Sequence, residues 1–295
     1  MCNIQPGDQI SRFIFVERIG KGGFGSVYKC SIEGTQMKKF AALKVVSHQK
    51  SQTIENEKNI LEEIQESYPL FPRFYDAARC SSFYYIAMEY LGPSLDDIKL
   101  SLNEKKFNAF TIMYVASKTL QCIQDLHSYG IIHRDIKPSN FLLRNNDNSI
   151  CLTDFGLSTH YVVNDRHIPF GSMKEVGTLY FQSLASHSNY TLSRKDDLES
   201  WIYTLLYLRD KTLPWMIPDN SAIPLKKRQT INGLIKDWEP FYEIYEDVMK
   251  LKFEEEPHYQ KYVDLIDKAL SEFTQEEMIY SWDNNNINVL CCSIC

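Results

Sequence analysis

The first ninety residues carry the hydrophobic pattern of a β-sheet interrupted by one helix. Between residues 12 and 46, short apolar runs such as Phe13 and Phe15 alternate with polar residues and are separated by glycines. Residues 54–66 instead repeat apolar side chains at three- and four-residue intervals, as in a helix, and residues 84–88 return to the strand pattern. This part of the chain is therefore predicted to form an antiparallel sheet with one main helix.

Beyond Gly92-Pro93 the pattern becomes mostly helical. An apolar stripe from Phe110 to His127 predicts a long helix that ends near Gly130, a residue suited to a helix C-terminus. Residues 198–208 are apolar nearly all round, which is typical of a helix buried at the centre of a lobe. Amphipathic helices are predicted around residues 229–237, 241–252 and 259–273. The fold class that follows is α+β, with a larger, mostly helical C-terminal part.

One segment concentrates the candidate chemistry. It reads His133-Arg134-Asp135-Ile136-Lys137-Pro138-Ser139-Asn140, and Asp154-Phe155-Gly156 begins fourteen residues after Asn140. This layout resembles that of protein kinases. The resemblance implies that Asp135 orients the substrate hydroxyl or accepts its proton, that Lys137 offsets charge on the transferring phosphoryl group, and that Asn140 and Asp154 hold magnesium. A purely structural role is disfavoured because the residues form one ordered set.

A glycine-rich segment joins two strand-like runs near the N-terminus. In a dinucleotide-binding fold such a segment leads into a helix, but here Val27 continues as strand, which favours a flap over ATP phosphates. Glycine lets backbone N–H groups approach the phosphates without an obstructing Cβ. A plain hairpin turn is the alternative. The expected nucleotide-binding residues here are Ile19, Gly20, Lys21, Gly22, Gly23, Phe24, Gly25 and Val27.

A strand lysine, Lys44, follows Ala42-Leu43 in the manner of the kinase lysine that contacts the α- and β-phosphates. Glu57, thirteen residues later on the predicted helix, is expected to pair with it, and Glu55 and Glu62 are the competing candidates. Glu57 is preferred because Leu61 then faces the same way and can pack behind Phe155. Ala42, Lys44 and Glu57 thus join the predicted nucleotide site.

Lys137 bears on substrate type as well. A lysine at this position resembles serine/threonine kinases, whereas tyrosine kinases carry a different sequence there. Gly177-Thr178 is then the loop that faces the substrate, and the Thr178 hydroxyl is expected to bridge Asp135 and Lys137.

Several further segments resemble the casein kinase I family and its relatives, the tau-tubulin and vaccinia-related kinases. They include Leu91-Gly92-Pro93-Ser94-Leu95-Asp96-Asp97, Arg194-Lys195-Asp196-Asp197-Leu198-Glu199-Ser200, Leu213-Pro214-Trp215, Lys227-Arg228-Gln229 and Tyr280-Ser281-Trp282-Asp283-Asn284. The resemblance covers residues 12–284 and implies one bilobal kinase catalytic domain, with an N-lobe at 12–91 and a C-lobe at 92–284. It also implies that adenine bonds the backbone at Glu89 and Leu91, that Met88 lines the back of the pocket, and that the enzyme is active without activation-loop phosphorylation.

Two departures concern substrate choice. Tyr180 stands where casein kinase I carries an arginine of its anion-binding pocket, and Thr230 stands where it carries a lysine. Loss of two cations removes charge-assisted contacts worth ~1.5–3 kcal/mol each. With Lys174 as a remaining cation, we expect weak discrimination between phosphoprimed and unprimed peptides.

Composition limits the expected partners and cellular location of the protein. The net charge of −6 disfavours nucleic acid and anionic membranes as partners, and no apolar run approaches the length of a membrane span. The one basic cluster, Lys226-Lys227-Arg228, is interpreted as a solvated helix start or loop, with an anion-binding role as the alternative. Scattered cysteines without a disulfide or zinc pattern indicate a reducing compartment, so the expected protein is a cytoplasmic monomer that acts on serine or threonine in proteins.

The chain ends in a short cysteine-rich tail, residues 285–295. Cys292 lies four residues from the end, as in a prenylation signal, and Cys291 is a candidate for palmitate, so peripheral membrane attachment is set against an unmodified tail. Two other functions stay open at this level: a pseudokinase-like scaffold, and a small-molecule kinase of similar fold. Retention of Lys44, Asp135, Asn140 and Asp154 argues against the scaffold, and Lys137-Pro138 with Gly177-Thr178 argues against the small-molecule kinase.

Overall fold

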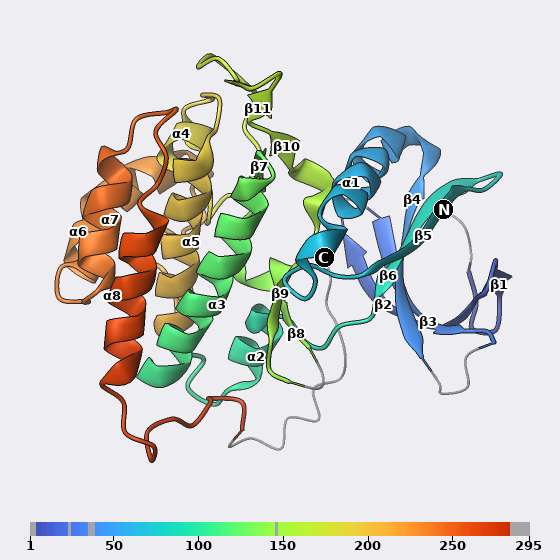
Figure 1. Cartoon of the computed structure of the whole chain (residues 1–295), viewed down its shortest axis with the longest axis horizontal. Helices are drawn as coiled ribbons and strands as arrows, with labels where there is room; N and C mark the ends of the chain where they lie inside the picture. Colours follow the sequence, from blue (N-terminus) through green and yellow to red (C-terminus); the bar gives the residue numbers. More distant parts are fainter. Residues whose placement is uncertain (1–3, 23–24, 35–38, 145–146, 284–295) are drawn as a thin grey trace. The chain divides into compact units, whose positions relative to one another are not determined.

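The computed structural model describes residues 4–22, 25–34, 39–144 and 147–283 (Figure 1). The predictions for Gly23, Phe24, Cys291 and Cys292 and for the tail at 285–295 lie outside these residues. The chain forms two compact units that are discontinuous in sequence. Among the described residues, the sheet unit contains those up to Asp97 together with Ser139–Leu157, and the helical unit contains Ile98–Pro138 and the residues from Ser158 to Asp283.

The sheet unit is built on a six-stranded antiparallel sheet in the order β1-β2-β3-β4-β6-β5 (Figure 1). One main helix, α1 (Ser51–Glu63), packs against β4, β5 and β6, so the prediction of a sheet with one helix is confirmed. The strands are β1 (Gln9–Ile10), β2 (Phe13–Gly22), β3 (Gly25–Ile32), β4 (Phe40–Ser47), β5 (Phe74–Arg79) and β6 (Phe83–Glu89), and short 3₁₀ helices lie at His48–Lys50 and Gln65–Ser67.

Alternation along β2 explains the core of this sheet. Phe13 and Phe15 are buried and contact Tyr85 and Tyr28 edge-on, while Ile14 between them is only partly buried. Burial of each large apolar side chain contributes about 1.5–3 kcal/mol. At the start of β3, Gly25 has a φ of +145°, and a Cβ there would lie 2.3 Å from the Val45 carbonyl oxygen, so this close approach of two strands requires glycine.

A second piece of chain completes the sheet unit. Strands β8 (Phe141–Leu143) and β9 (Ile150–Leu152) form an antiparallel hairpin, and the 3₁₀ helix η4 (Phe155–Leu157) follows it. Helix α1 packs against η4, and the Phe155 ring meets Phe71 edge-on at 5.7 Å between centroids. The Asp-Phe-Gly segment therefore belongs to the same packed body as α1.

The helical unit is organised around α3 (Ala109–Ser128) and α5 (Arg194–Arg209), which pack against each other, with α8 against α3 and α7 against α5 (Figure 1). Trp201 in α5 is fully buried and donates from its indole nitrogen to Thr119 Oγ1 of α3 at 2.8 Å. The other helices are α4 (Leu184–His187), α6 (Ile223–Ile235), α7 (Phe241–Lys250) and α8 (Tyr259–Ser271). Helix α2 (Leu95–Ser101) begins in the sheet unit and ends in the helical unit. The short elements of this unit are β7 (Ile131–Ile132), β10 (Thr159–His160), β11 (Val162–Val163), β12 (Arg166–His167) and the 3₁₀ helix Asn220–Ala222. A further 3₁₀ helix, Pro138–Asn140, begins in this unit and ends in the sheet unit.

Most predicted helices of this unit are present, and α3 ends just before Gly130 as expected. One boundary was wrong: α6 begins at Ile223, six residues before the predicted start at 229. Pro224 occupies the first turn, where its missing N–H has no intrahelical partner to lose. The basic cluster thus lies inside a helix. Among the residues described, no helix is both long and apolar enough to cross a bilayer.

Candidate active site

A buried cluster of three charged groups forms the centre of the sheet unit's site. Lys44 Nζ lies 2.7 Å from Glu57 Oε2 and 2.7 Å from Asp154 Oδ1, and all three side chains are nearly inaccessible to solvent. Burial alone lowers the pKa of Lys44, but the attraction of Asp154 and Glu57 outweighs it and raises that pKa. Burial raises the pKa of Glu57 and Lys44 opposes that effect. The lysine is therefore held charged and in place.

Of the three candidate partners of Lys44, Glu57 is the one in contact with it. Glu62 instead pairs with Lys58 on the exposed side of α1 at 3.3 Å, and Glu55 lines a small hollow with Lys58 and Arg79. Leu61 is completely buried on the same helix. The thirteen-residue spacing works because β4 pairs with β6 beneath α1, which brings Lys44 under the helix.

The two expected metal ligands are held next to each other by backbone bonds. Thr153 donates from its N–H and its hydroxyl to the Asn140 carbonyl oxygen, at 2.9 and 3.1 Å, and Asp154 follows Thr153 directly. Asp154 has a φ of +66°, a left-handed conformation that is uncommon for a residue with a Cβ. Such a conformation at a buried carboxylate is typical of a functional position.

The residues expected around adenine also lie in the sheet unit. Ala42 and Met88 are register partners of β4 and β6, both buried, and Leu91 clusters with Leu142 and Cys151 of the β8–β9 hairpin. Backbone bonds from Gly92 to Leu143 and from Leu143 to Pro93 tie the segment after β6 to the hairpin. Strands β2 and β3 remain paired along the glycine-rich segment that follows Ile19. Gly20 lies opposite Val27, and Gly22 lies opposite Gly25, with Lys21 between them in β2.

Arg144 is a supporting residue that the sequence did not indicate. Its guanidinium is buried, forms an ion pair with Glu89, and donates to the carbonyl oxygens of Pro69 at 2.7 Å and Phe71 at 3.1 Å. It thereby fixes the end of β6, where adenine is expected, to the hairpin. No motif carries this signal, because the partners are separated from Arg144 by 55 to 75 residues.

The helical unit carries the second cluster, made of Asp135, Lys137 and Thr178. Lys137 Nζ lies 2.8 Å from Asp135 Oδ2 and donates to Thr178 Oγ1 at 2.9 Å. Thr178 in turn donates its backbone N–H to Asp135 Oδ1 at 2.7 Å. The threonine thus connects the lysine and the aspartate, but its hydroxyl accepts from Lys137 whereas its backbone N–H, and not the expected hydroxyl, donates to Asp135. Gly177 allows this approach: its φ is +93°, and a Cβ would lie 2.6 Å from the Arg134 carbonyl oxygen.

Asp197, near the start of α5, supports the loop that carries Asp135. Its carboxylate accepts the backbone N–H groups of His133 at 2.6 Å and Arg134 at 2.8 Å, and Nε2 of His127 lies 3.0 Å away. Burial raises the pKa of Asp197, but the bonds from His127 and the His133 backbone prevail and hold it below its ordinary value. Arg134 has a φ of +66°, so the carboxylate stabilises a bent segment.

The two departures from the casein kinase I pattern have their own local partners. The Tyr180 carbonyl oxygen accepts from the indole nitrogen of Trp215 at 2.9 Å, and the Thr230 hydroxyl donates back to Lys226 within α6 at 2.8 Å. Lys174 is exposed. Tyr180 and Thr230 therefore provide no cation at the two positions where casein kinase I carries an arginine and a lysine.

The interpretation of the basic cluster as a solvated segment was wrong for Lys227. This side chain is completely buried, whereas Arg228 is exposed and Lys226 is intermediate. Lys227 Nζ donates to the Gln182 carbonyl oxygen at 2.5 Å and lies 4.5 Å from the centre of the Tyr203 ring. Sequence composition treated the three cations alike, although helix geometry turns only the middle one inward.

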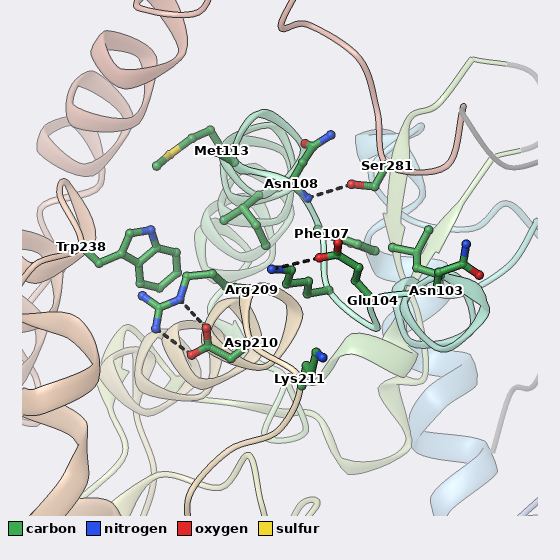
Figure 2. A pocket seen from close by; sticks show the side chains of 14 residues that line it. Asn103, Glu104, Phe107, Asn108, Met113, Arg209, Asp210, Lys211, Trp238 and Ser281 are labelled. Carbon is green, nitrogen blue, oxygen red and sulfur yellow. Dashed lines mark hydrogen bonds and ion pairs between the residues drawn. The ribbon is translucent and has the colours of Figure 1, made fainter.

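An open groove of about 1050 Å³ lies elsewhere in the helical unit (Figure 2). On one side Trp238 stacks on Arg209, whose guanidinium is also paired with Asp210, and on another Asn108 donates to Ser281. None of the predicted site residues lines it. Its lining mixes both charges with apolar side chains, and the groove is separate from the Asp135 cluster.

Comparison with known proteins agrees with this fold. The model of the protein kinase domain matches residues 13–276. A solved structure of vaccinia related kinase 3 superposes with a TM-score of 0.81, covering 92% of this chain and 93% of that one at 18% sequence identity. The fold and the two charged clusters together define the class of a protein kinase domain.

Sequence relatives narrow the class. A probable casein kinase I homologue of Encephalitozoon cuniculi is 33% identical over 278 residues, covering 88% of this chain and 85% of the relative. A casein kinase 1-like protein of rice is 32% identical and casein kinase I homolog 1 of Schizosaccharomyces pombe is 28% identical, and the chain spans 40% and 63% of their lengths. The chain belongs to the casein kinase I family of serine/threonine protein kinases. A domain of this class uses ATP and a divalent metal ion.

Proposed function

We propose that this chain transfers the γ-phosphoryl group of Mg-ATP to serine or threonine hydroxyls of proteins, with Asp135 as the base. The observation that carries the proposal is the pair of preorganised clusters, Lys44–Glu57–Asp154 in the sheet unit and Asp135–Lys137–Thr178 in the helical unit. Phosphoryl transfer depends mainly on positioning and on electrostatic stabilisation, and these clusters supply the charged groups it needs.

In the sheet unit, each group has a proposed role toward ATP. Lys44 neutralises the α- and β-phosphates and Glu57 keeps its ammonium from swinging away. The backbone of Gly20, Lys21, Gly22 and Gly25 approaches the phosphates, and Ala42, Val27 and Met88 offer apolar surface to adenine, whose edge bonds the backbone at Glu89 and Leu91.

Asn140 and Asp154 are the proposed ligands of magnesium. Their oxygens suit a hard cation, and magnesium is commonly held by one or two carboxylates together with substrate phosphates. Within the described residues no group of three or more histidine, cysteine or acidic side chains forms a metal site on its own. When bound, the ion neutralises charge on the phosphates.

In the helical unit, Asp135 orients the substrate hydroxyl and takes its proton. Lys137 is held 2.8 Å from this carboxylate, and its ammonium is proposed to offset the negative charge that develops on the transferring group. Thr178 fixes both partners through its hydroxyl and its backbone N–H. The base is therefore oriented before the substrate binds.

The test is steady-state phosphorylation of casein with Mg-ATP by wild type and by Asp135→Asn. Wild type is expected to turn over at kinase-like rates, and the variant to lose at least 10³-fold in kcat while its ATP affinity stays within a few-fold. If the wild type binds ATP yet transfers no phosphoryl group to any protein, the scaffold alternative is correct instead. ATP turnover with a small-molecule acceptor alone would favour the small-molecule kinase.

Substrate selectivity is the finer part of the proposal. With Tyr180 and Thr230 in place of two cations, the surface near Thr178 retains little to bind a primed phosphate. Peptides with a phosphoserine three residues before the target are expected to react at rates within a few-fold of unprimed ones. The double variant Tyr180→Arg/Thr230→Lys should raise the primed-to-unprimed ratio about tenfold or more, because each charge-assisted contact contributes ~1.5–3 kcal/mol. A strong preference for primed peptides in wild type would contradict this proposal.

Localisation is a separate proposal. We propose a cytoplasmic monomer, with lipid attachment at Cys291 or Cys292 as the route to a membrane. Mass spectrometry of protein purified from its native cell tests the attachment, because prenylation or palmitoylation adds a defined mass to the C-terminal peptide. An unmodified C-terminal peptide rules out the anchor.

A further inference from the structure

Lys227 is the starting point, because a buried lysine inside a lobe core requires partners. Its side chain is completely buried in α6, and burial lowers its pKa to about 7. Glu199 and Glu175 attract the ammonium, and the ring faces of Tyr203 and Trp215 lie 4.5 and 5.8 Å from Nζ. Burial of an ammonium is costly unless it is hydrogen-bonded and paired, so its contacts have to be specific.

The first arm of contacts runs from Lys227 toward the base. Lys227 Nζ donates to the Gln182 carbonyl oxygen at 2.5 Å, and the Gln182 side chain donates to the Gly177 carbonyl oxygen at 3.0 Å. Gln182 also donates its backbone N–H to the Thr178 carbonyl oxygen at 3.1 Å. Thr178 then donates to Asp135. Gln182 thus connects the buried cation to the Gly177-Thr178 turn.

The second arm reaches the other side of the same loop. Nε2 of His187, at the end of α4, lies 3.2 Å from Lys227 Nζ, and its Nδ1 lies 3.2 Å from Glu175 Oε1. Because the ammonium has only donors, Nε2 accepts and the ring proton sits on Nδ1, facing the carboxylate. Burial together with Lys227 and Arg228 lowers the pKa of His187 to about 4, which keeps this tautomer neutral at pH 7.

The beginning of α4 is anchored to the same region. Glu199 of α5, a buried carboxylate that attracts Lys227, accepts the backbone N–H of Leu184 at 2.9 Å and the Tyr203 hydroxyl at 2.6 Å. The loop from Glu175 to His187 is therefore held at Gln182, Leu184 and His187 by one buried charged group of residues. These are the residues that follow directly after the substrate-facing Gly177-Thr178 turn.

We propose that Lys227 is a positioning residue for the protein substrate: its buried ammonium holds the loop of residues 175–187 at Gln182 and His187 and so keeps Thr178 in place against Asp135. The inference rests on the proposed function, because it assigns this loop to the binding of the acceptor protein. It predicts a selective effect on the peptide, since the ATP-binding groups are in the sheet unit.

The central experiment compares Lys227→Met with Lys226→Met. Both remove one cation from adjacent positions of α6, but only Lys227 is buried. Lys227→Met is expected to raise the KM for a protein or peptide substrate about tenfold or more, with the KM for ATP within twofold of wild type. Lys226→Met is expected to leave both KM values unchanged. Equal peptide KM values in the two variants, or parallel rises in both KM values of Lys227→Met, would overturn the proposal.

A pH series separates positioning from general packing. Below pH 7 Lys227 is charged, and above it the amine becomes neutral, so its attraction to Glu199 and Glu175 is lost. The peptide KM of wild type and of Lys226→Met should rise between pH 6 and 8.5, while that of Lys227→Met should lack this rise. The nearby ionisable side chains, His187, Tyr203, Glu199, Glu175 and Arg228, are present in all three proteins. Identical pH profiles for all three would contradict the proposal.

Two further measurements keep the inference testable if Lys227→Met does not fold. Gln182→Ala leaves the buried cation in place but removes the bond to Gly177, and it is expected to raise the peptide KM with little change for ATP. Hydrogen exchange needs no activity: amides of residues 177–187 should exchange at least tenfold faster in Gln182→Ala than in wild type, with amides of the sheet unit unchanged. Unaltered exchange and an unaltered peptide KM would together disprove the proposal. A third outcome is possible: the wild type transfers no phosphoryl group, yet the amides of residues 177–187 exchange faster in Gln182→Ala than in wild type. That outcome would contradict the proposed function but not the role of Lys227 in holding the loop.

Discussion

At the scale of single residues, Glu57 determines whether Lys44 is held in one place. Its carboxylate and that of Asp154 share one buried ammonium, and each lies 2.7 Å from it. Glu57→Gln removes the charge and keeps the size of the side chain, so the lysine should lean toward Asp154. We expect kcat to fall at least tenfold and the KM for ATP to rise several-fold in steady-state assays.

The matched control for this variant is Glu62→Gln on the same helix. Glu62 pairs with Lys58 at the surface, where such a pair contributes only about 0–1 kcal/mol. Its loss should leave both kinetic constants near those of wild type. Equal effects of the two variants would show that Glu57 acts through helix stability and not through Lys44.

Asp197 makes a prediction about stability and pH. The hydrogen bonds to the Asp197 carboxylate lower its pKa in the folded protein. The ionised carboxylate therefore stabilises the fold above the unfolded pKa of about 3.9, and this contribution is lost as the pH falls below that value toward the lower folded pKa. Asp197→Asn should reduce the free energy of unfolding at pH 7 by roughly 2–4 kcal/mol, measured by urea denaturation. The difference from wild type should shrink toward pH 3; a difference independent of pH would refute the assignment.

Single residues also mark the limit of prediction from sequence. Asp135, Lys137, Asn140 and Asp154 were predicted from the resemblance to protein kinases, because the motifs that carry this resemblance lie in one short stretch of sequence. Arg144 and Lys227 did not follow from the sequence, because their partners Pro69 and Gln182 are 75 and 45 residues away. A charged side chain that is buried by distant parts of the chain has no local signature.

At the scale of elements, the last described segment closes the start of α3. Asn108 caps α3 by accepting from Thr111 and donates its side-chain amide to the Ile279 carbonyl oxygen, while Ser281 bonds both Asn108 and Thr111. The Tyr280 and Trp282 rings stack at 4.9 Å with an interplanar angle of 5°. The segment at residues 280–284 that resembles the casein kinase I family thus has a structural role: its described residues hold the start of α3 in place.

Trp282 provides a test of this structural role. The ring is almost fully buried and meets Phe107 edge-on at 5.9 Å. Trp282→Ala should lower the free energy of unfolding by about 3–5 kcal/mol in chemical denaturation, since a large buried ring is removed. Trp282→Phe, which keeps an aromatic ring, should recover at least half of the loss. A loss below ~1 kcal/mol for the alanine variant would show that the segment is only loosely held.

Elements also show where periodicity succeeds and fails. Strands β2 to β4 and helices α3 and α5 were predictable because burial on one face, or on all faces, repeats along the sequence. The start of α6 was misplaced because Lys226-Lys227-Arg228 interrupts the apolar pattern, although Lys227 is as buried as Ile223 and Ile231 in the same helix. Hydrophobic patterns therefore shorten an element wherever its buried face includes a charge.

At the scale of the whole molecule, nucleotide binding should be visible without turnover. A ligand that binds only the folded state stabilises it by about 2.7 kcal/mol at a hundredfold excess over its Kd. ADP with magnesium should raise the midpoint of thermal unfolding by a few degrees, and chelation with EDTA should remove most of the rise. Asp154→Asn should abolish the part that depends on the metal. A rise that EDTA leaves unaltered would argue against Asn140 and Asp154 as metal ligands.

The discontinuity of the two units has a consequence for recombination between relatives. The chain passes from one unit to the other after Asp97, after Pro138 and after Leu157. A chimera with a single crossover at residue 97 would take Lys44 from one parent and its partner Asp154 from the other, and would pair one parent's β6 with the other's β8–β9 hairpin. Within the described part of the chain, three coincident crossovers are needed to exchange a unit intact, so single-crossover libraries should yield inactive chimeras wherever the parents differ around Lys44, Arg144 or Asp154.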